Sequence, residues 1–162
     1  MLDDALIDQS EVIFCLALST SERDLYQPQI PLFGREVDDK LSGMAEDIGE
    51  AAKCLSVHRY TACVFHLMRA MEGAVQRLSE SLSITNPSRE WGKLLSDIKP
   101  KIAAMQTGEM RNKWSENFAL LYHVKQAWRN DTMHPKQTYT EEEAKEVFSA
   151  TRSFMKNLAA LV

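Results

Sequence analysis

An apolar stripe with the period of an α-helix runs through the middle of this chain, and it restricts the fold more than any other feature of the sequence. One face of an α-helix recurs every 3.6 residues, whereas one face of a strand recurs at every second residue. The stripe alternates spacings of three and four, and its members are Thr61, Val64, Met68, Met71, Val75, Leu78 and Leu82. The sequence therefore predicts one long helix from about residue 58 to residue 82 with a single buried face.

Three other stretches carry helical signals of the same kind. Residues 37–55 repeat apolar side chains every three or four positions and predict a first helix of about five turns. Residues 90–105 are helical in pattern but contain Pro100, which has no backbone N–H to donate, so two short helices are expected there. Residues 111–129 predict a helix that buries Trp114, Leu121 and Trp128.

The last helix has the clearest start signal in the sequence. Thr140 followed three residues later by Glu143 is a capping box, in which each side chain bonds the other residue's backbone N–H. The predicted buried stripe of this helix is Ala144, Val147, Phe148, Thr151, Met155, Leu158 and Val162. No stretch after residue 36 is rich in strand signals. We therefore expect an all-α fold, a small antiparallel bundle of about five helices.

The first 35 residues differ in character from the rest. A short apolar run, residues 12–18, precedes a segment that contains Pro28 and Pro31, which predicts one short element followed by extended chain. Such a piece is suited to packing on a partner or on a preceding domain. We accordingly divide the chain into an N-terminal segment, residues 1–35, and a helical bundle, residues 36–162.

Composition limits the class of protein. The chain has 162 residues and a net charge of −4, which argues against a surface that coats nucleic acid, although it leaves room for a local basic cleft. Three cysteines without a CxxC pair indicate neither a disulfide framework nor a zinc cluster. No motif for another metal or for a cofactor is present, such as HExxH or a Gly-rich phosphate loop, and none is expected. The longest N-terminal apolar run is too short to span a bilayer. We expect a cytoplasmic protein that does not enter a membrane.

The segment WRNDTMHP, residues 128–135, contains the residues best suited to chemistry. Arg129 and His134 would point about 140° apart on a continuous helix, but Pro135 cannot continue a helix and disfavours the helical region for the residue before it. A turn here would bring the imidazole toward the guanidinium. A permanent cation beside a group that titrates near neutrality suits phosphate chemistry. The alternative is structural, with Arg129 capping carbonyl groups and His134 bonding a turn.

A second arginine–histidine pair has a looser spacing. Arg59 and His66 lie seven residues apart on the long predicted helix, so their Cα atoms would be about 10 Å from each other. Short groups cannot cooperate directly over that distance. We therefore treat this pair as a chance match.

The segment AWRNDTMHPKQTYTEEEA, together with FHLMRAMEGAVQRL on the long helix, resembles the HEPN domain family over residues 36–162. The resemblance implies a metal-independent endoribonuclease that acts as a homodimer in prokaryotic defence or a toxin–antitoxin response, with an antitoxin or other protein as a further partner. It implies His134 as general acid or base, Arg129 as the group that stabilises phosphoryl charge, and Asn130 as the group that orients the histidine or a phosphate oxygen. Non-catalytic members that bind a partner protein or a nucleotide are the alternative.

Other residues are weaker candidates. Arg69 and Glu72 lie three apart on the long helix and either support the site or form a surface salt bridge. HEPN toxins that are paired with a nucleotidyltransferase carry a tyrosine two residues after the histidine, where this chain has Lys136, and Tyr139 is the nearest tyrosine. The basic residues around the motif, Lys125 and Lys136, are the candidates for RNA contact.

Overall fold

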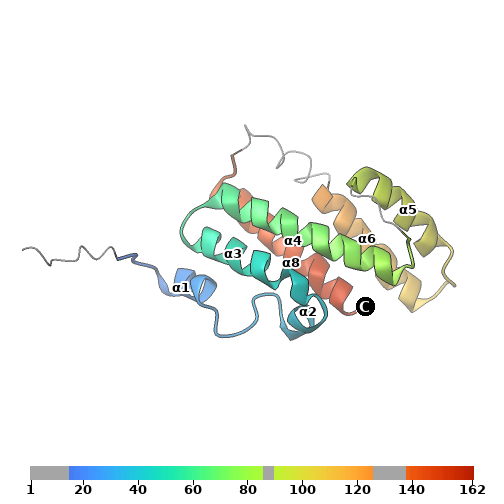
Figure 1. Ribbon diagram of the computed structural model, residues 1–162, viewed down its shortest axis with the longest axis horizontal. Helices are drawn as coiled ribbons and strands as arrows, with labels where there is room; N and C mark the ends of the chain where they lie inside the picture. Colours follow the sequence, from blue (N-terminus) through green and yellow to red (C-terminus); the bar gives the residue numbers. More distant parts are fainter. Residues whose placement is uncertain (1–14, 86–89, 126–137) are drawn as a thin grey trace, which may run out of the picture.

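The long stripe forms helix α4, against which α3 and α8 pack, while α5 packs on α6 and α1 on α3 (Figure 1). The structure, a computed structural model, describes residues 15–85, 90–125 and 138–162. In these residues it contains seven α-helices, one short 3₁₀-helix and no strand, so the all-α prediction is confirmed. The elements are α1 (Thr20–Tyr26), α2 (Arg35–Lys40), η1 (Ser42–Met44), α3 (Ala45–Ser56), α4 (Tyr60–Ser81), α5 (Trp91–Ala103), α6 (Glu109–Val124) and α8 (Glu141–Ala159).

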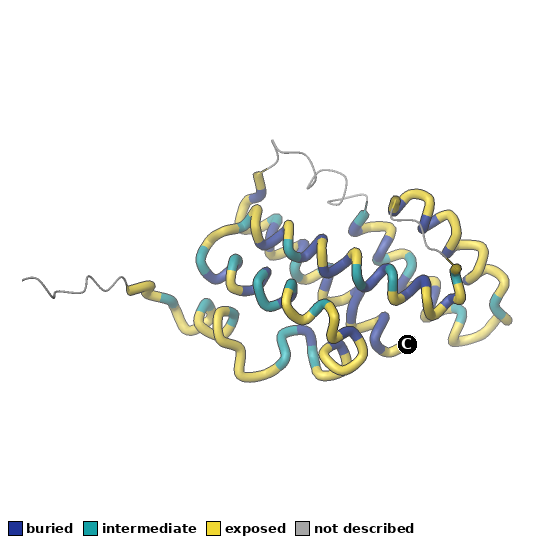
Figure 2. Tube along the Cα trace, viewed as in Figure 1, coloured by how far each residue is buried: buried dark blue, intermediate teal, exposed yellow. Residues whose placement is uncertain are grey.

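Helix α4 buries the predicted stripe almost completely. Six of its seven members are buried and only Thr61, in the first turn, is exposed. Helices α3 and α8 both pack against α4, and the buried side of each tube in Figure 2 faces its neighbours. Only three residues connect α3 to α4, so these two helices are antiparallel. Helices α4 and α8 begin at the same end of the bundle, where the Tyr139 backbone N–H donates to Thr61 Oγ1 at 3.1 Å.

The prediction of one five-turn helix over residues 37–55 was wrong. Leu41 leaves the helical region with φ −123° and ψ 34°, and η1 follows before α3 begins. The stripe remains buried on both sides of the break, with Val37 at 1% exposure and Ile48 at 4%. Lys40 Nζ donates to the carbonyl of Ala159 at 2.8 Å, which holds α2 against the C-terminal end of α8. This tertiary contact turns α2 out of line with α3.

The expected division at Pro100 was also wrong, because α5 continues through the proline as a single helix. Proline removes one backbone hydrogen bond, the one that would reach the carbonyl of Ser96. Ile98 and Ile102 lie on either side of Pro100 and are both buried, at 0% and 5% exposure. Burial of the continuous apolar face outweighs the missing hydrogen bond.

The short N-terminal helix of the described residues, α1, begins after the apolar run, whose first three residues lie outside the described ranges. Helix α1 starts at a capping box in which Ser19 Oγ accepts from the Glu22 backbone N–H and the Glu22 carboxylate accepts from the Ser19 backbone N–H. The segment that contains Pro28 and Pro31 follows α1 and is followed by Phe33, which is fully buried. The ring of Phe33 contacts the ring of Phe148 edge-on, with the two centroids 5.1 Å apart. The hydrophobic core therefore includes a residue on the N-terminal side of the boundary drawn at residue 35.

The capping box at the start of α8 is confirmed. Thr140 Oγ1 accepts from the Glu143 backbone N–H at 3.3 Å, and the Thr140 backbone N–H donates to Glu143 at 2.8 Å. Most of the predicted stripe is buried, Phe148 is half-buried, and Val162 lies beyond the end of the helix. No helix in the described ranges is both long enough and apolar enough to cross a membrane.

Helix α6 buries Trp114 and Leu121 as predicted, but it also buries a polar residue. Asn117 is 0% exposed, and neither its amide nitrogen nor its oxygen has a hydrogen-bond partner among the described residues. A buried polar group without a partner costs about 1–3 kcal/mol.

We expect Asn117→Leu to raise the free energy of unfolding by about 1 kcal/mol, since it removes that cost and tighter packing offsets part of the gain. Urea denaturation followed by circular dichroism measures the change. The matched control is the exposed Asn157, whose replacement by leucine is expected to change stability by less than about 0.5 kcal/mol. A loss of stability in the Asn117 variant would show that the amide makes a contact in the folded protein.

The three cysteines differ in accessibility, and this gives a test of the packing of α3 and α4. Cys15 is exposed, Cys54 is half-buried, and Cys63 is buried with its pKa raised to about 12 by desolvation. The thiolate is the reactive form. At pH 8 we expect a disulfide reagent to label Cys15 first and Cys63 only after denaturation, as measured by mass spectrometry of the labelled peptides. Rapid labelling of Cys63 in the native protein would contradict this packing.

Candidate functional site

The residues predicted to carry the chemistry, Arg129, Asn130, His134 and Lys136, lie outside the described residues. The described chain stops at Lys125, directly after α6, and resumes at Thr138, directly before Tyr139 and α8. Helices α6 and α8 pack against each other, so both ends of the segment that holds the motif are fixed to the bundle. Described side chains surround Tyr139 at the end of the bundle where α4 and α8 begin.

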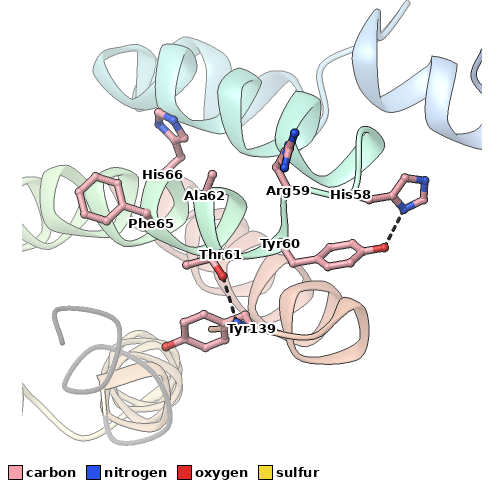
Figure 3. A pocket seen from close by; sticks show the side chains of 8 residues that line it. All are labelled: His58, Arg59, Tyr60, Thr61, Ala62, Phe65, His66 and Tyr139. Atoms are coloured by element: carbon pink, nitrogen blue, oxygen red, sulfur yellow. Dashed lines mark hydrogen bonds between the residues drawn. The ribbon is translucent and has the colours of Figure 1, made fainter. Parts of the chain in front are cut away.

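A pocket of about 590 Å³ lies where α4 begins (Figure 3). It is bordered by the first turn of α4 and by Tyr139, the residue before the N-cap of α8. Figure 3 shows Arg59 and His66 on the side of α3, and Tyr139 on the other side, beyond Thr61. The lining residues are His58, Arg59, Tyr60, Thr61, Ala62, Phe65, His66 and Tyr139.

One edge of the pocket is a chain of polar contacts that joins α1, α4 and α8. His58 has a left-handed backbone (φ 60°) and places its ring between Glu22 and Tyr60, with Nε2 3.0 Å from the Glu22 carboxylate and Nδ1 2.7 Å from Tyr60 Oη. Tyr60 Oη donates to Glu141 at 3.1 Å. Glu22, His58, Tyr60 and Glu141 thus form one continuous line of polar contacts.

The charges of this network follow from its contacts. Bonds from Ser19 lower the pKa of Glu22, and His58 lowers it further. Bonds from Lys145 and then Tyr60 lower the pKa of Glu141. Desolvation, followed by the bond to Glu141, raises the pKa of the Tyr60 hydroxyl. At neutral pH the two carboxylates are therefore ionised and Tyr60 keeps its hydrogen.

The opposite edge contains a histidine held by a carboxylate. His66 Nδ1 lies 2.9 Å from Asp47 Oδ1 on α3, and the same oxygen is 3.2 Å from Arg69 Nε. The side chains of His66 and Asp47 are 26% and 18% exposed, so the pair is partly shielded from water. A carboxylate on Nδ1 fixes the ring and leaves Nε2 as the nitrogen that can meet a ligand.

The pocket lining also includes one cation, Arg59, which lies between these edges in Figure 3, and one aromatic ring, Phe65, which lies at the end beside His66. Arg59 is exposed at the N-cap of α4, and in the described part of the chain its guanidinium makes no hydrogen bond or ion pair. Phe65 is 45% exposed, and the centroid of its ring is 6.4 Å from that of His66. A large apolar side chain exposed beside an unpaired cation is a common composition for a ligand site.

The structure places the weaker sequence candidates in different surroundings. Tyr139 lines the pocket and is 8% exposed. Arg69 contacts Asp47 of α3 in the salt bridge described above, and Glu72 is exposed on α4. Lys125 is half-buried, and its Nζ is 3.8 Å from the position that a Cβ would take on Gly92. It belongs to the contact between α5 and α6 and does not line this pocket.

The sequence analysis did not predict that Arg59 and His66 line the same pocket. The pair was set aside because one helix separates the two Cα atoms too far for direct cooperation. The structure places both side chains on a single pocket, where one ligand larger than either side chain can reach both. Two features of the sequence could have indicated this pocket. Arg59 stands at the start of the long predicted helix, and the preceding predicted helix contains an acid, Asp47, that can pair with His66.

No group of three or more potential metal-ligating side chains occurs within the described ranges. Comparison with models of protein families, with curated proteins and with solved structures finds no match for this chain.

Proposed function

We propose that this protein is a metal-independent endoribonuclease of the HEPN type that acts as a homodimer in prokaryotic defence or a toxin–antitoxin response. Arg129 and His134 of each copy are the proposed catalytic residues, and Asn130 orients the histidine or a phosphate oxygen. The first support for the proposal is the resemblance in the sequence. The second is that Tyr139, which precedes α8 and follows the motif in the chain, lines a pocket with basic and aromatic groups.

The position of Tyr139 is the observation that carries most of the support. Tyr139 lines the pocket and is five residues after His134 in the chain. Five residues span at most about 18 Å. The covalent chain therefore sets about 18 Å as the upper limit for the distance between the Cα atoms of Tyr139 and His134.

The proposed reaction is attack of an RNA 2′-hydroxyl on the adjacent phosphorus. The 2′-hydroxyl gives its proton to a base, its oxygen forms a new bond to phosphorus, and the bond to the 5′-oxygen of the next nucleotide breaks as that oxygen gains a proton. The products are a 2′,3′-cyclic phosphate and a 5′-hydroxyl. His134 serves as acid or base, and Arg129 stabilises the charge on the phosphoryl oxygens.

The test is cleavage of single-stranded RNA in the presence of a chelator, with analysis of the new ends by mass spectrometry. We expect cyclic phosphate ends with the natural chain, no cleavage with an Arg129→Ala/His134→Ala double variant, and no cleavage of 2′-O-methyl RNA. Equal cleavage by the natural and double-variant proteins would refute the assignment of this pair. RNA or nucleotide binding without cleavage by the natural protein would favour the non-catalytic alternative.

A further inference from the structure

We propose that the pocket at the start of α4 is a binding subsite for one nucleotide of the RNA substrate, with the phosphate at Arg59 and the base against Phe65. This inference rests on the proposed function, because it takes RNA as the ligand. It assigns a binding role to residues outside the predicted catalytic motif.

The size and surface of the pocket fit a single nucleotide. Its volume, about 590 Å³, is within the range of about 300–1,000 Å³ that small-ligand pockets occupy. Ala62 and Phe65 line it together with polar groups, so it can receive both a flat apolar body and an anion. None of its lining residues is acidic.

Arg59 is the group that would hold the phosphate. Arg59 is an exposed residue of the pocket lining, and its guanidinium makes no ion pair or hydrogen bond within the described residues, so binding a phosphate breaks no such contact there. Guanidinium groups match phosphate oxygens with paired N–H donors. His66, fixed through Nδ1 by Asp47, offers Nε2 as a second group on the same side.

The carboxylates close to the pocket would repel a bound anion, but the contacts that they already make weaken this repulsion. Each already contacts a cation or hydrogen-bond donor: Glu22 contacts His58, Asp47 contacts His66 and Arg69, and Glu141 contacts Tyr60 and Lys145. Arg59 is the pocket cation without such a contact in the described chain. The charge of Arg59 is therefore the one in the pocket lining that no described carboxylate contacts.

Phe65 is the group that would hold the base. It is one of the few large hydrophobic side chains exposed in the described structure, and the adjacent His66 ring meets it edge-on at an interplanar angle of 83°. A base that stacks on an exposed aromatic ring strengthens binding of single-stranded nucleic acid by about five- to 150-fold. Both Arg59 and Phe65 are exposed, so their replacement is compatible with an intact core.

The experiment measures binding of a fluorescent 2′-O-methyl RNA oligonucleotide, which cannot be cleaved by 2′-hydroxyl attack, by anisotropy in chelator at several salt concentrations. We expect Arg59→Gln to weaken binding about tenfold and to lower the slope of log affinity against log salt by about 0.7, the value for one phosphate contact on a single strand. Phe65→Ala is expected to weaken binding at least fivefold, the lower end of the effect of losing one stacked base, with the salt slope unchanged.

The matched controls are Arg77→Gln, on the same helix far from the pocket, and Tyr26→Ala, an exposed aromatic on α1. Neither is expected to change affinity by more than twofold. If Arg59→Gln and Phe65→Ala bind like their controls, or if the natural protein does not bind the oligonucleotide, the subsite is refuted. Cleavage assays with His134→Ala report separately on the proposed function, because this binding experiment does not require catalysis.

Discussion

His134→Ala is expected to lower the rate of RNA cleavage by about 10²–10⁴-fold, the usual contribution of a positioned general acid or base. Alanine removes the imidazole and leaves nothing at that position to accept or donate a proton. The measurement is the single-turnover rate on a labelled single-stranded RNA in chelator. His66→Ala is the matched comparison, because it removes a histidine that is bound to Asp47 and that we assign to substrate binding.

The two histidine variants should separate rate from affinity. Loss of His134 is expected to reduce the rate at saturating enzyme, whereas loss of His66 is expected to raise the enzyme concentration needed for half-maximal rate. Arg129→Ala should resemble His134→Ala, and Arg129→Lys should recover little, because an ammonium cannot form the paired contacts of a guanidinium. A normal rate in the His134 variant combined with a lost rate in the His66 variant would move the catalytic assignment to the pocket.

Phe33→Ala is expected to lower the free energy of unfolding by about 3–5 kcal/mol, the usual cost of truncating a buried phenylalanine. Phe33 is 0% exposed and packs edge-on against Phe148 of α8. The substitution removes this contact and leaves a cavity between the N-terminal part of the chain and α8. Urea denaturation followed by circular dichroism gives the change.

The control for this prediction is Phe65→Ala, which removes the same atoms from a ring that is 45% exposed. It is expected to cost less than about 1 kcal/mol. If the Phe33 variant were as stable as the natural chain, the segment before α2 would not belong to the core. That result would agree with the division of the chain at residue 35 in the sequence analysis. Such a result would also contradict the burial of Phe33.

The helical pattern was legible in the sequence wherever local chemistry and burial favoured the same structure. Helix α4 and the capping box of α8 were both predicted, because an apolar stripe of period 3.6 and a Thr-x-x-Glu start are local signals. The capping box of α1, Ser19 to Glu22, was an equally local signal that was overlooked in favour of the apolar run before it.

The failures came where a distant contact decides between local options. Pro100 is a strong helix-breaking signal, yet the buried face on both sides of it keeps α5 continuous. The periodicity of residues 37–55 contains no sign of the break at Leu41, because α2 is held by a contact between Lys40 and the end of α8 more than a hundred residues away. The period of an apolar stripe predicts which side chains are buried, but it does not predict which other helix covers them.

The sequence by itself determined the all-α class, the positions of the longest helices and the candidate catalytic motif around Arg129 and His134. Those conclusions rest on spacing, capping and residue chemistry, which are properties of short stretches of chain. Only the tertiary structure brought Arg59, Phe65 and His66 into one pocket with Tyr139, because α8 returns to the start of α4 through a contact between residues 61 and 139. The physical reason is that a pocket is formed by the packing of helices, and packing depends on contacts between residues that are far apart in the chain.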